Sequence, residues 1–405
     1  MSLLPVADAR QQILADIAPL PAEQVPLTDA HLRIAGNSLS ANRTQPPFNA
    51  SAMDGYAVRH ADLKFHDKPL RLVGEVAAGN SYSKAIAEGE TVRIFTGAPL
   101  PFGADTILIQ EDAELLESGE IQPTEIPKLG AFVRKSGLDF SEGDQLIDQF
   151  TKLCSADIAL LASMNHPNVP VIRKPRIGVL ATGNELVMPG EEIGPDQIVA
   201  SNNFGIAARI TELGGIPVPL GIAQDTKQSL SNALDAAKTK KCDAIVTLGG
   251  ASVGTHDLVQ ETFKDAGLEL AFWKIAMRPG KPLMFGRVNG IVFLGFPGNP
   301  VSSMVCAELF LAPLINAWLG QSKEIKFSKA RLTHPLKAND RREDYLRAHI
   351  DLKVSATELP KITAMSKQDS SMLAVFRQAN ALIVRPPFAP ESASGSLVDV
   401  LLLRS

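Results

Sequence analysis

Three patterns of apolar and polar residues follow one another along the chain. In the first, apolar residues recur every three to four positions, at Val6, Ala9, Ile13, Leu14 and Ile17. This spacing predicts an amphipathic helix that ends before Pro19 and Pro21. From about residue 46 to residue 143, short β-rich runs alternate with Gly, Pro and Asn turns, which predicts a small all-β lobe. Residues 155–163 then predict a short helix with Ser155 as its N-cap.

Between residues 175 and 320 the pattern changes to strand, loop and helix in repeated order. The extended runs are RIGVLATG, IPVPLGIAQD, DAIVTLGG, LELAFWKIAM and IVFLGF. The helical runs are SNNFGIAARITELGG, TKQSLSNALDAAKTK, HDLVQETFKDAG and PVSSMVCAELFLAPLINAWLG. This alternation predicts an α/β domain with a doubly wound, mostly parallel sheet. The tail from residue 326 to residue 405 returns to short apolar runs between Pro and Gly, which predicts a second small β domain.

The composition narrows the classes of function. A chain of 405 residues is expected to form roughly two to four domains. Its 40 Lys and Arg against 44 Asp and Glu give a net charge of −4, and aromatic residues make up 5%. The chain therefore has neither the basic field nor the base-stacking residues expected of a nucleic-acid-binding protein.

Neither a membrane nor an oxidising compartment is indicated. No apolar run reaches about 18 residues, and the N-terminal stretch lacks the basic region and apolar core of a signal peptide. The cysteines show no paired spacing, as expected of small buried side chains in a reducing compartment; they are Cys154, Cys242 and Cys306. We therefore expect a cytoplasmic protein that binds neither membrane nor nucleic acid.

Polar or glycine-rich residues follow four of the predicted strands. They lie at residues 181–186, 223–225, 249–257 and 295–300. The carboxyl ends of parallel strands meet at one edge of a sheet, and ligands of α/β proteins bind there. Backbone N–H groups and helix N-termini at such an edge attract phosphate. We therefore expect the four loops to form one anion site, although each loop alone is also compatible with an ordinary turn or helix start.

Acidic and basic side chains accompany these loops. The acidic residues are Glu185, Asp225 and Asp257. Carboxylates beside a phosphate imply a bridging divalent cation, most simply Mg²⁺, because like charges otherwise repel. The run WKIAMRPGK would complete the anion site with Lys274, Arg278 and Lys281. Each acid taken alone is also compatible with a solvated surface position.

The sequence GASVG at residues 250–254 also fits the Gly-x-Ser-x-Gly pattern of a hydrolase nucleophile elbow, with Ser252 as nucleophile. An elbow places its serine at the turn itself, and the helix starts at once. Here the following helix is expected to start near Thr255, and the later His334 and His349 lie in the predicted tail domain. The residues therefore favour an anion-binding loop, in which Ser252 donates a hydrogen bond.

A set of longer motifs spans nearly the whole chain. It consists of NASAMDGYAVR, RIFTGAPLPFGADTIL, LATGNEL, SNNFGIAARITELGG, TLGGASVGTHD, FWKIAMRPGKPLMFG and GFPGNPVSS. In content and order, the set resembles the molybdopterin molybdenumtransferases, a family that includes bacterial MoeA and the E domain of gephyrin. The combination of SAMDGYA with GGxSxG and PGKP is specific to that family, whereas GGASVG alone also fits molybdopterin adenylyltransferases.

The resemblance implies a fold of four parts and a homodimer. The parts are an extended helical segment for dimerisation, a β-rich lobe with the MDGYA motif, an α/β molybdopterin-binding domain and a C-terminal β-barrel-like domain. They correspond to residues 1–45 with 142–172, 46–141, 173–325 and 326–405. In the family, the active cleft is thought to lie between the α/β domain of one subunit and the MDGYA lobe of the other.

The resemblance also implies a reaction. Adenylylated molybdopterin and molybdate are the substrates, Mg²⁺ or a similar ion takes part, and AMP and the molybdenum cofactor are the products. Glu185, Asp225 and Asp257 match the family's acidic cluster, and Asp54 is expected beside them as a catalytic residue. The substrate-binding positions carried over are Thr96, Thr182, Gly183, Ser201, Gly249, Gly250, Ser252, Gly254, Lys274, Arg278, Lys281, Pro297, Gly298, Asn299, Arg347 and Ser370. Among these, Arg347 and Ser370 match residues thought to hold molybdate. An Asp-Gly pair such as the one at Asp54 is also an ordinary turn former.

Three positions depart from the family pattern. Arg278 stands where Lys is expected, Asn184 stands where Asp is frequent, and His256 adds a titratable group beside Asp257. Two other functions stay open. One is a nucleotide enzyme related to molybdopterin adenylyltransferase, and the other is a non-catalytic scaffold of the gephyrin type. The adenylyltransferase itself and the enzymes that accept the cofactor are further expected partners.

Overall fold

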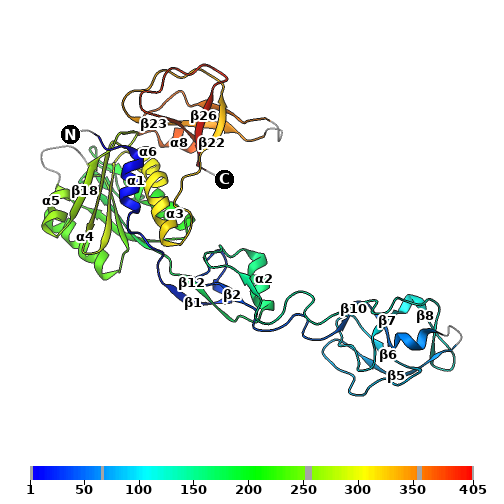
Figure 1. Ribbon diagram of the computed structural model, residues 1–405. Coiled ribbons are helices and arrows are strands. Elements are labelled where there is room, and N and C mark those ends of the chain that lie inside the picture. Colours follow the sequence, from blue (N-terminus) through cyan, green and yellow to red (C-terminus); the bar gives the residue numbers. More distant parts are fainter. Residues whose placement is uncertain (1–2, 65–67, 251–257, 354–357, 404–405) are drawn as a thin grey trace. The chain divides into compact units, whose positions relative to one another are not determined.

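A computed structural model describes residues 3–64, 68–250, 258–353 and 358–403, and it mixes helices and sheets as the sequence predicts. The chain divides into two compact units (Figure 1). One unit combines Met1–Glu23 with Ile172–Ser405, and the other is Gln24–Val171. The candidate site lies within the first unit, which holds the α/β domain and the C-terminal barrel.

The α/β domain is built on a six-stranded sheet. Its order is β16 (Ile216–Ala223), β13 (Arg176–Thr182), β17 (Ala244–Leu248), β21 (Ile291–Phe296), β20 (Pro282–Val288) and β18 (Glu269–Lys274). The first four strands are parallel, whereas β20 is antiparallel to its neighbours β21 and β18. Both central strands, β17 and β21, are buried along their whole length, as expected of strands covered on both faces. The four parallel strands therefore bring their carboxyl ends to one edge.

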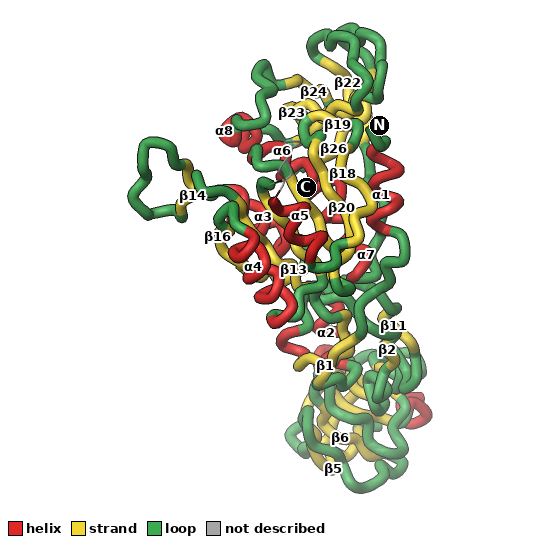
Figure 2. Tube along the Cα trace, turned by 90° about the vertical axis from the view of Figure 1, so that its left-hand side faces the viewer, coloured by secondary structure: helices red, strands yellow, loops and turns green. Residues whose placement is uncertain are grey.

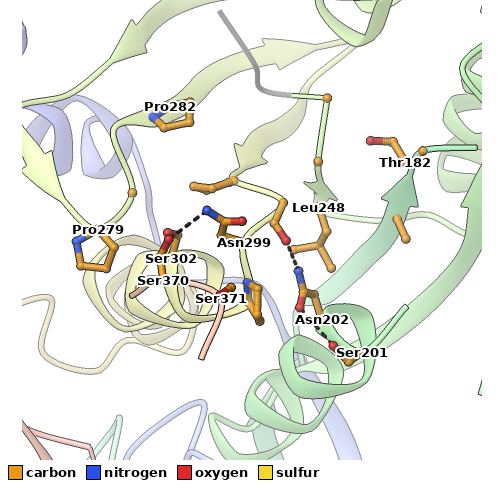
Figure 3. Close-up of a pocket in the computed structure, with 18 of the residues that line it drawn as sticks. Thr182, Ser201, Asn202, Leu248, Pro279, Pro282, Asn299, Ser302, Ser370 and Ser371 are labelled. Carbon is orange, nitrogen blue, oxygen red and sulfur yellow. Dashed lines mark hydrogen bonds between the residues drawn. The ribbon is translucent and has the colours of Figure 1, made fainter. Parts of the chain in front are cut away.

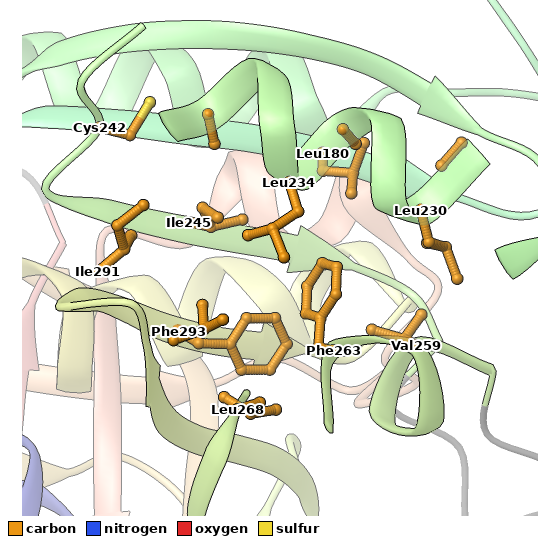
Figure 4. Close-up of a cluster of buried hydrophobic side chains, with 14 of the residues drawn as sticks. Leu180, Leu230, Leu234, Cys242, Ile245, Val259, Phe263, Leu268, Ile291 and Phe293 are labelled. Carbon is orange, nitrogen blue, oxygen red and sulfur yellow. The ribbon is translucent and has the colours of Figure 1, made fainter. Parts of the chain in front are cut away.

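Helices cover both faces of this sheet (Figure 1). On one face, α4 (Lys227–Thr239) and α5 (Leu258–Asp265) enclose a core in which the Phe263 and Phe293 rings meet edge to face, 5.0 Å between centroids (Figure 4). The other face carries α3 (Asn202–Glu212), α1 (Val6–Leu14) and a continuous helical run. That run consists of α6 (Pro300–Cys306), the π-helical turn η4 (Ala307–Leu311) and α7 (Ala312–Trp318).

Two helix ends differ from the sequence prediction. The first helix stops at Leu14 rather than near Pro19, because the backbone is extended at Ala15 (ψ 136°) and left-handed at Asp16 (φ 58°). The helix α2 (Ser155–Ser163) has the predicted length, but its N-cap is Cys154 and not Ser155. There the Asp157 carboxylate accepts a hydrogen bond from the Cys154 N–H at 2.8 Å, which satisfies an amide at the helix start.

The C-terminal domain is a small barrel. Its sheet has the order β19 (Met277–Arg278), β23 (Glu343–Asp351), β24 (Lys361–Ala364), β22 (Ser328–Leu332), β26 (Leu397–Leu402) and β25 (Ala381–Arg385). Pairing of β25 with β23 closes five of these strands into a barrel, and α8 (Leu373–Gln378) packs against β23. The strand β19 belongs to the segment that follows β18 of the α/β domain. Its pairing with β23 therefore joins the barrel to the α/β domain.

A short excursion leaves the α/β domain after β13. It contains β14 (Leu186–Val187) and β15 (Ile198–Val199), which pair in parallel and stand out from the domain in Figure 2. Its apolar residues are largely exposed; Ile198, for example, keeps 59% of its surface. The excursion returns directly to the start of α3.

The second unit is mainly β-structure, as the sequence predicts. Its six-stranded sheet has the order β7 (Thr106–Ile109), β4 (Gly55–Val58), β6 (Glu90–Ile94), β5 (Leu70–Val76), β9 (Glu120–Pro123) and β8 (Ala113–Leu115). Smaller pairs join β10 (Val133–Arg134) to β3 (Ala50–Ser51), β11 (Gln145–Ile147) to β2 (Leu39–Ser40) and β1 (Ala22–Pro26) to β12 (Asn168–Ile172). Short 3-10 turns occur at η1 (Leu27–Asp29), η2 (His60–Lys64) and η3 (Gln110–Asp112).

One helical run has the length and composition of a membrane span. It is Pro300–Trp318, the only such run among the residues that the structure describes. Of the most apolar stretch of this helical run, 83% is buried inside the protein. A buried helix of this kind is typical of a protein core, where it packs against the sheet.

Candidate active site

A cavity of about 1130 Å³ lies at the carboxyl ends of the four parallel strands (Figure 3). Its wall combines the loops after β13, β16, β17 and β21 with the turn between β19 and β20 and with residues 368–371 of the barrel domain. The predicted site residues that line it are Thr182, Gly183, Glu185, Ser201, Asp225, Gly249, Gly250, Arg278, Lys281, Pro297, Gly298, Asn299 and Ser370. The cavity therefore collects residues that are far apart in the sequence, from Thr182 to Ser370.

The loop after β17 needs glycine at two positions. Gly249 and Gly250 have φ of +100° and +64°, which glycine adopts without steric cost. A Cβ at Gly249 would lie 2.8 Å from the Thr182 carbonyl oxygen, and one at Gly250 would lie 2.3 Å from Cγ2 of Val259. Beside them, the buried Thr182 hydroxyl has no hydrogen-bond partner among the described residues. Both glycines are therefore required by the positive φ values and by close packing against Thr182 and Val259, next to a hydroxyl that can bond a ligand.

Side-chain amides tie neighbouring loops together. Asn184 Oδ1 accepts a hydrogen bond from the Asp225 N–H at 3.0 Å, which joins the loops after β13 and β16. Asn202 Nδ2 donates to the Gly298 carbonyl at 2.6 Å, which joins the start of α3 to the loop after β21. The structure thereby gives Asn184 a role that needs an acceptor oxygen and no negative charge.

Two of the three predicted acidic residues line the cavity. They are Glu185 and Asp225, and the Glu185 carboxylate folds over Gly183, whose Cβ would lie 2.3 Å from Oε2. Ser252, Gly254, Thr255, His256 and Asp257 lie outside the described residues. Within the part of the chain that the structure describes, no three His, Cys, Asp or Glu side chains come together in a way that could hold a metal ion. The three-acid cation site, which includes Asp257, stays a prediction.

The basic residues of the site separate into different environments. Lys281 lines the cavity, whereas Lys274 does not line it and places its ammonium 4.5 Å from the centroid of the Trp273 ring. Arg278 lines the cavity and donates to Asp344, whose hydrogen bond raises the pKa of the Arg278 guanidinium. Its charge is therefore largely balanced by a carboxylate before any anion binds.

A second, smaller cavity of about 230 Å³ adjoins this region. It is lined by Arg278, Pro279, Asp344, Leu346, Arg347 and Gln368. Arg347 is only 2% exposed, and its guanidinium donates to the Asp369 carbonyl at 3.1 Å. Its buried Nε has no partner among the described residues, and burial lowers the pKa of this group, although an arginine stays protonated in proteins. Arg347 and Ser370 therefore line different cavities, which share Arg278, Pro279 and Gln368.

Ser370 connects the barrel to the start of α6. Asn299 is the N-cap residue of α6, as predicted, but its side chain makes no cap hydrogen bond. Instead, Asn299 Nδ2 donates to Ser370 Oγ at 2.9 Å, and the Val301 N–H donates to the Ser370 carbonyl at 3.0 Å (Figure 3). An amide of this helix start is thus satisfied within the protein.

The remaining predicted residues, Asp54 and Thr96, lie in the second unit. The Asp54 carboxylate accepts hydrogen bonds from the Thr96 N–H at 2.7 Å and from the Thr96 hydroxyl at 2.8 Å. These two bonds lower the pKa of Asp54 below its ordinary value of 3.8. The following Gly55 packs against β7, since a Cβ there would lie 2.2 Å from the Leu108 carbonyl oxygen. The Asp-Gly pair thus combines a close strand contact with an oriented carboxylate.

Several polar residues of the site were not predicted from the sequence. Those that line the large cavity are Asn202, Asn203, Ser302, Arg342, Gln368, Asp369 and Ser371, and Asp344 lines the small one. Asn202, Asn203 and Ser302 lie at the starts of two predicted helical runs, so a search for polar residues at every helix start would have found them. The others lie on the barrel domain, where apolar runs alone do not indicate which residues face the sheet edge.

Comparison with known protein families gives matches along most of the chain. Three family models match it: the MoeA N-terminal region (domain I and II) over residues 4–165, the probable molybdopterin binding domain over residues 178–317, and the MoeA C-terminal region (domain IV) over residues 329–403. The matches cover both units and the barrel.

Individual relatives match over their full length. The molybdopterin molybdenumtransferase of Haemophilus influenzae is 32% identical over 401 residues, which is 98% of this chain and 98% of the relative. The protein of the same name from Nostoc is 34% identical over 412 residues, 100% of this chain and 91% of the relative. The solved structure of a molybdopterin biosynthesis MoeA protein from Pyrococcus horikosii is 31% identical, covers 100% of both chains and has a TM-score of 0.86.

Proposed function

Because the chain belongs to the molybdopterin molybdenumtransferase family, we propose that it transfers molybdenum from molybdate to adenylylated molybdopterin and releases AMP. The observation that carries this proposal is the cavity at the carboxyl edge of the sheet. It combines a glycine loop suited to phosphate, two carboxylates and a wall of polar barrel residues. A substrate with phosphates and a tetrahedral oxyanion needs these three elements together.

The glycine loop binds the phosphates of the pterin substrate. Gly249 and Gly250 allow the positive φ values and the close packing that shape this loop at the cavity wall, and the buried Thr182 hydroxyl is available as a donor beside them. Ser252 and Gly254, which continue the loop outside the described residues, supply further donors in this proposal. The bulk of the substrate then lies in the large cavity between α3 and the turn at Lys281.

The carboxylates of Glu185 and Asp225 fit a Mg²⁺ site. Magnesium prefers carboxylate oxygens and substrate phosphates, and both side chains lie at the edge where the phosphates are proposed to bind. A bound Mg²⁺ would neutralise charge on the pyrophosphate group. We assign Asp257 to the same cluster, where it orients the water that attacks the pyrophosphate, because it follows the phosphate loop directly in sequence.

The oxyanion binds on the barrel side of the site. Arg347 offers a planar fork of donors, and its Nε is uncommitted among the described residues. Ser370 and Lys281 lie on the neighbouring wall of the large cavity. Arg278 is held by Asp344, so we assign it to the wall rather than to the oxyanion. Lys274 is likewise left out, because its ammonium lies over the Trp273 ring.

We further propose that the active form is a cytoplasmic homodimer. The family resemblance supports it, because the MDGYA lobe of one subunit would then complete the site of the other. Asp54 suits such a role, since Thr96 holds its carboxylate ionised and oriented on the surface of the second unit. The dimer would be seen as a doubled mass under native conditions.

Molybdate-dependent release of AMP from adenylylated molybdopterin tests this function. The adenylyltransferase alternative predicts consumption of ATP with molybdopterin instead. The scaffold alternative predicts neither reaction. The purified chain is expected to release AMP only when molybdate is present, and Asp257→Asn is expected to slow the release by about a hundredfold or more, as for loss of a group that acts in the reaction.

A further inference from the structure

The side chain of Gln368 forms hydrogen bonds with both the N–H and the carbonyl of the Arg347 backbone. Its Oε1 accepts a hydrogen bond from the Arg347 N–H at 3.0 Å, and its Nε2 donates to the Arg347 carbonyl at 2.9 Å. The same Nε2 donates to the Met365 carbonyl at 2.8 Å. All polar atoms of this carboxamide are thus used, and all of them bond to backbone atoms.

The contact continues a strand pairing that stops short of Arg347. On this edge of β23, the register with β24 runs from Asp351 to Ala348, which lies opposite Ala364. One residue further, the Met365 N–H still donates to the Arg347 carbonyl at 2.8 Å. No residue of β24 reaches the Arg347 N–H, and the Gln368 side chain takes that place. Gln368 therefore acts as a substitute for the next residue of the missing strand.

The guanidinium of Arg347 is held by the same segment. Asp369, the residue after Gln368, accepts a hydrogen bond from the Arg347 guanidinium through its carbonyl at 3.1 Å. Gln368 thus holds the backbone of Arg347, and the Asp369 carbonyl holds its guanidinium. Since Arg347 is 2% exposed and lines the small cavity, a shift of either anchor would move its uncommitted Nε within that cavity.

Ser370 joins this segment to the α/β domain. Its carbonyl accepts from Val301 and its hydroxyl accepts from Asn299, so residues 368–370 are anchored at both ends. The segment thereby connects the start of α6, on the large cavity, to Arg347 on the small one.

We propose that Gln368 is a positioning residue, which holds Arg347 in the register that lets its guanidinium bind the oxyanion substrate. The proposal rests on the function proposed above, because it takes molybdate as the oxyanion. Gln368 acts through Arg347 and need not touch the oxyanion itself. Loss of the carboxamide therefore weakens the response to molybdate and leaves binding of the pterin substrate intact.

Two variants remove different parts of the contact. Gln368→Met keeps a side chain of similar length but removes all three hydrogen bonds. Gln368→Glu keeps an acceptor for the Arg347 N–H, but it loses both donated bonds and places carboxylate oxygens against two carbonyls. Gln378→Met, at the exposed end of α8 in the same domain, is the matched control.

The test measures AMP release by the full chain against molybdate concentration and, separately, against adenylylated molybdopterin concentration. For both Gln368 variants we expect the half-saturating molybdate concentration to rise about tenfold or more, as for loss of buried hydrogen bonds. The half-saturating concentration of the pterin substrate is expected to stay at the wild-type value, and the Gln378→Met control is expected to match wild type in every measurement. The melting temperature of both Gln368 variants is expected to fall, because backbone groups of Arg347 and Met365 lose their side-chain partner. An unchanged molybdate response in the Gln368 variants, or an equal loss for both substrates, would overturn the proposal.

A double variant tests whether Gln368 acts through Arg347. In an Arg347→Ala background, adding Gln368→Met is expected to cause no further rise in the half-saturating molybdate concentration. A further rise as large as that in the wild-type background would show an independent effect and contradict the proposal. If the wild type itself shows no molybdate-dependent AMP release, the proposed function fails, whereas a normal wild type with unaffected Gln368 variants refutes this inference alone.

Discussion

Asn299 Nδ2 donates a hydrogen bond to Ser370 Oγ at 2.9 Å, and this bond joins the N-cap residue of α6 in the α/β domain to the barrel domain. Both residues line the large cavity. The contact is reinforced by the backbone bond from Val301 to the Ser370 carbonyl. The proposed oxyanion side of the site is therefore built from residues of two domains, which these polar contacts join at the cavity wall.

Ser370→Ala should weaken the response to molybdate. The substitution removes the hydroxyl that accepts from Asn299, but it leaves the backbone bond to Val301 in place. Loss of one such hydrogen bond is worth about 1 kcal/mol, so the half-saturating molybdate concentration should rise about fivefold. Steady-state AMP release measures this. Ser394→Ala, which removes an exposed hydroxyl bonded to the Thr333 carbonyl elsewhere in the barrel, serves as the control and should behave as wild type.

Asn184→Asp and Asn184→Ala should differ in activity. An aspartate can accept the hydrogen bond from the Asp225 N–H through a carboxylate oxygen, whereas an alanine cannot. We therefore expect Asn184→Asp to keep AMP release close to the wild-type rate and Asn184→Ala to lower kcat/KM about tenfold, because the loop that carries Asp225 is released. Equal activity of the two variants would mean that this bond does not orient Asp225.

Gly250→Ala should destabilise the loop after β17 by more than the free-energy cost of a positive φ at alanine. Its Cβ would lie 2.3 Å from Cγ2 of Val259, a buried residue of the α/β core. Gly290→Ala is the matched control, because Gly290 also has a positive φ, +81°, but nothing lies within 4 Å of its Cβ position. The control should lose about 1 kcal/mol of unfolding free energy in urea.

Gly250→Ala should lose more unfolding free energy than this control and should also bind adenylylated molybdopterin more weakly in calorimetry. A Gly250 variant that matches Gly290→Ala in stability and keeps wild-type affinity would show that the loop does not depend on this close packing.

Much of the α/β domain could be predicted from the sequence because its signals are local. The parallel strands are continuous apolar runs that end in glycine or polar residues, and the helices between them have clear periodicity. The short pair β14 and β15 was missed, and so was one strand of the six-stranded sheet, β20 (Pro282–Val288). The sequence held a signal for it, since Asn289 and Gly290 have the positive φ values of a hairpin turn and form the Asn-Gly pair that such turns prefer.

The contacts that shape the oxyanion side could not be predicted from local patterns. Arg278 meets Asp344 and Arg347 meets Gln368, and these partners come from separate elements. The sequence showed Arg278 as a free cation for an anion site, because nothing near it indicated the carboxylate that balances it. The contact of Lys274 with the Trp273 ring could not be predicted either, and the substrate-binding role of Lys274 stays a prediction.

Thr96→Val should change how stability depends on pH through Asp54. Hydrogen bonds from Thr96 lower the Asp54 pKa, so their contribution to stability is fully present above the ordinary value of 3.8 and is lost as the pH falls through the lower folded-state pKa. Valine removes the hydroxyl donor but keeps the backbone N–H. The melting temperature of wild type should exceed that of Thr96→Val by a constant amount above about pH 5, and the two should converge at lower pH.

Asp54→Asn provides a comparison for the same group, because an asparagine cannot ionise in this range. Its melting temperature relative to wild type should rise as the pH falls below about 4. A difference between wild type and Thr96→Val that stays constant down to pH 2.5 would contradict the assignment of the Asp54 pKa.

The most direct test of the central claim is the release of AMP from adenylylated molybdopterin by the purified full-length chain, followed with and without molybdate. We expect AMP to appear in proportion to the molybdenum cofactor formed, to require molybdate, and to fall sharply in Glu185→Gln and Asp225→Asn, whose side chains line the cavity. Release that does not depend on molybdate, or no release at all from a folded wild type, would contradict the assignment of this cavity as a molybdenum insertion site.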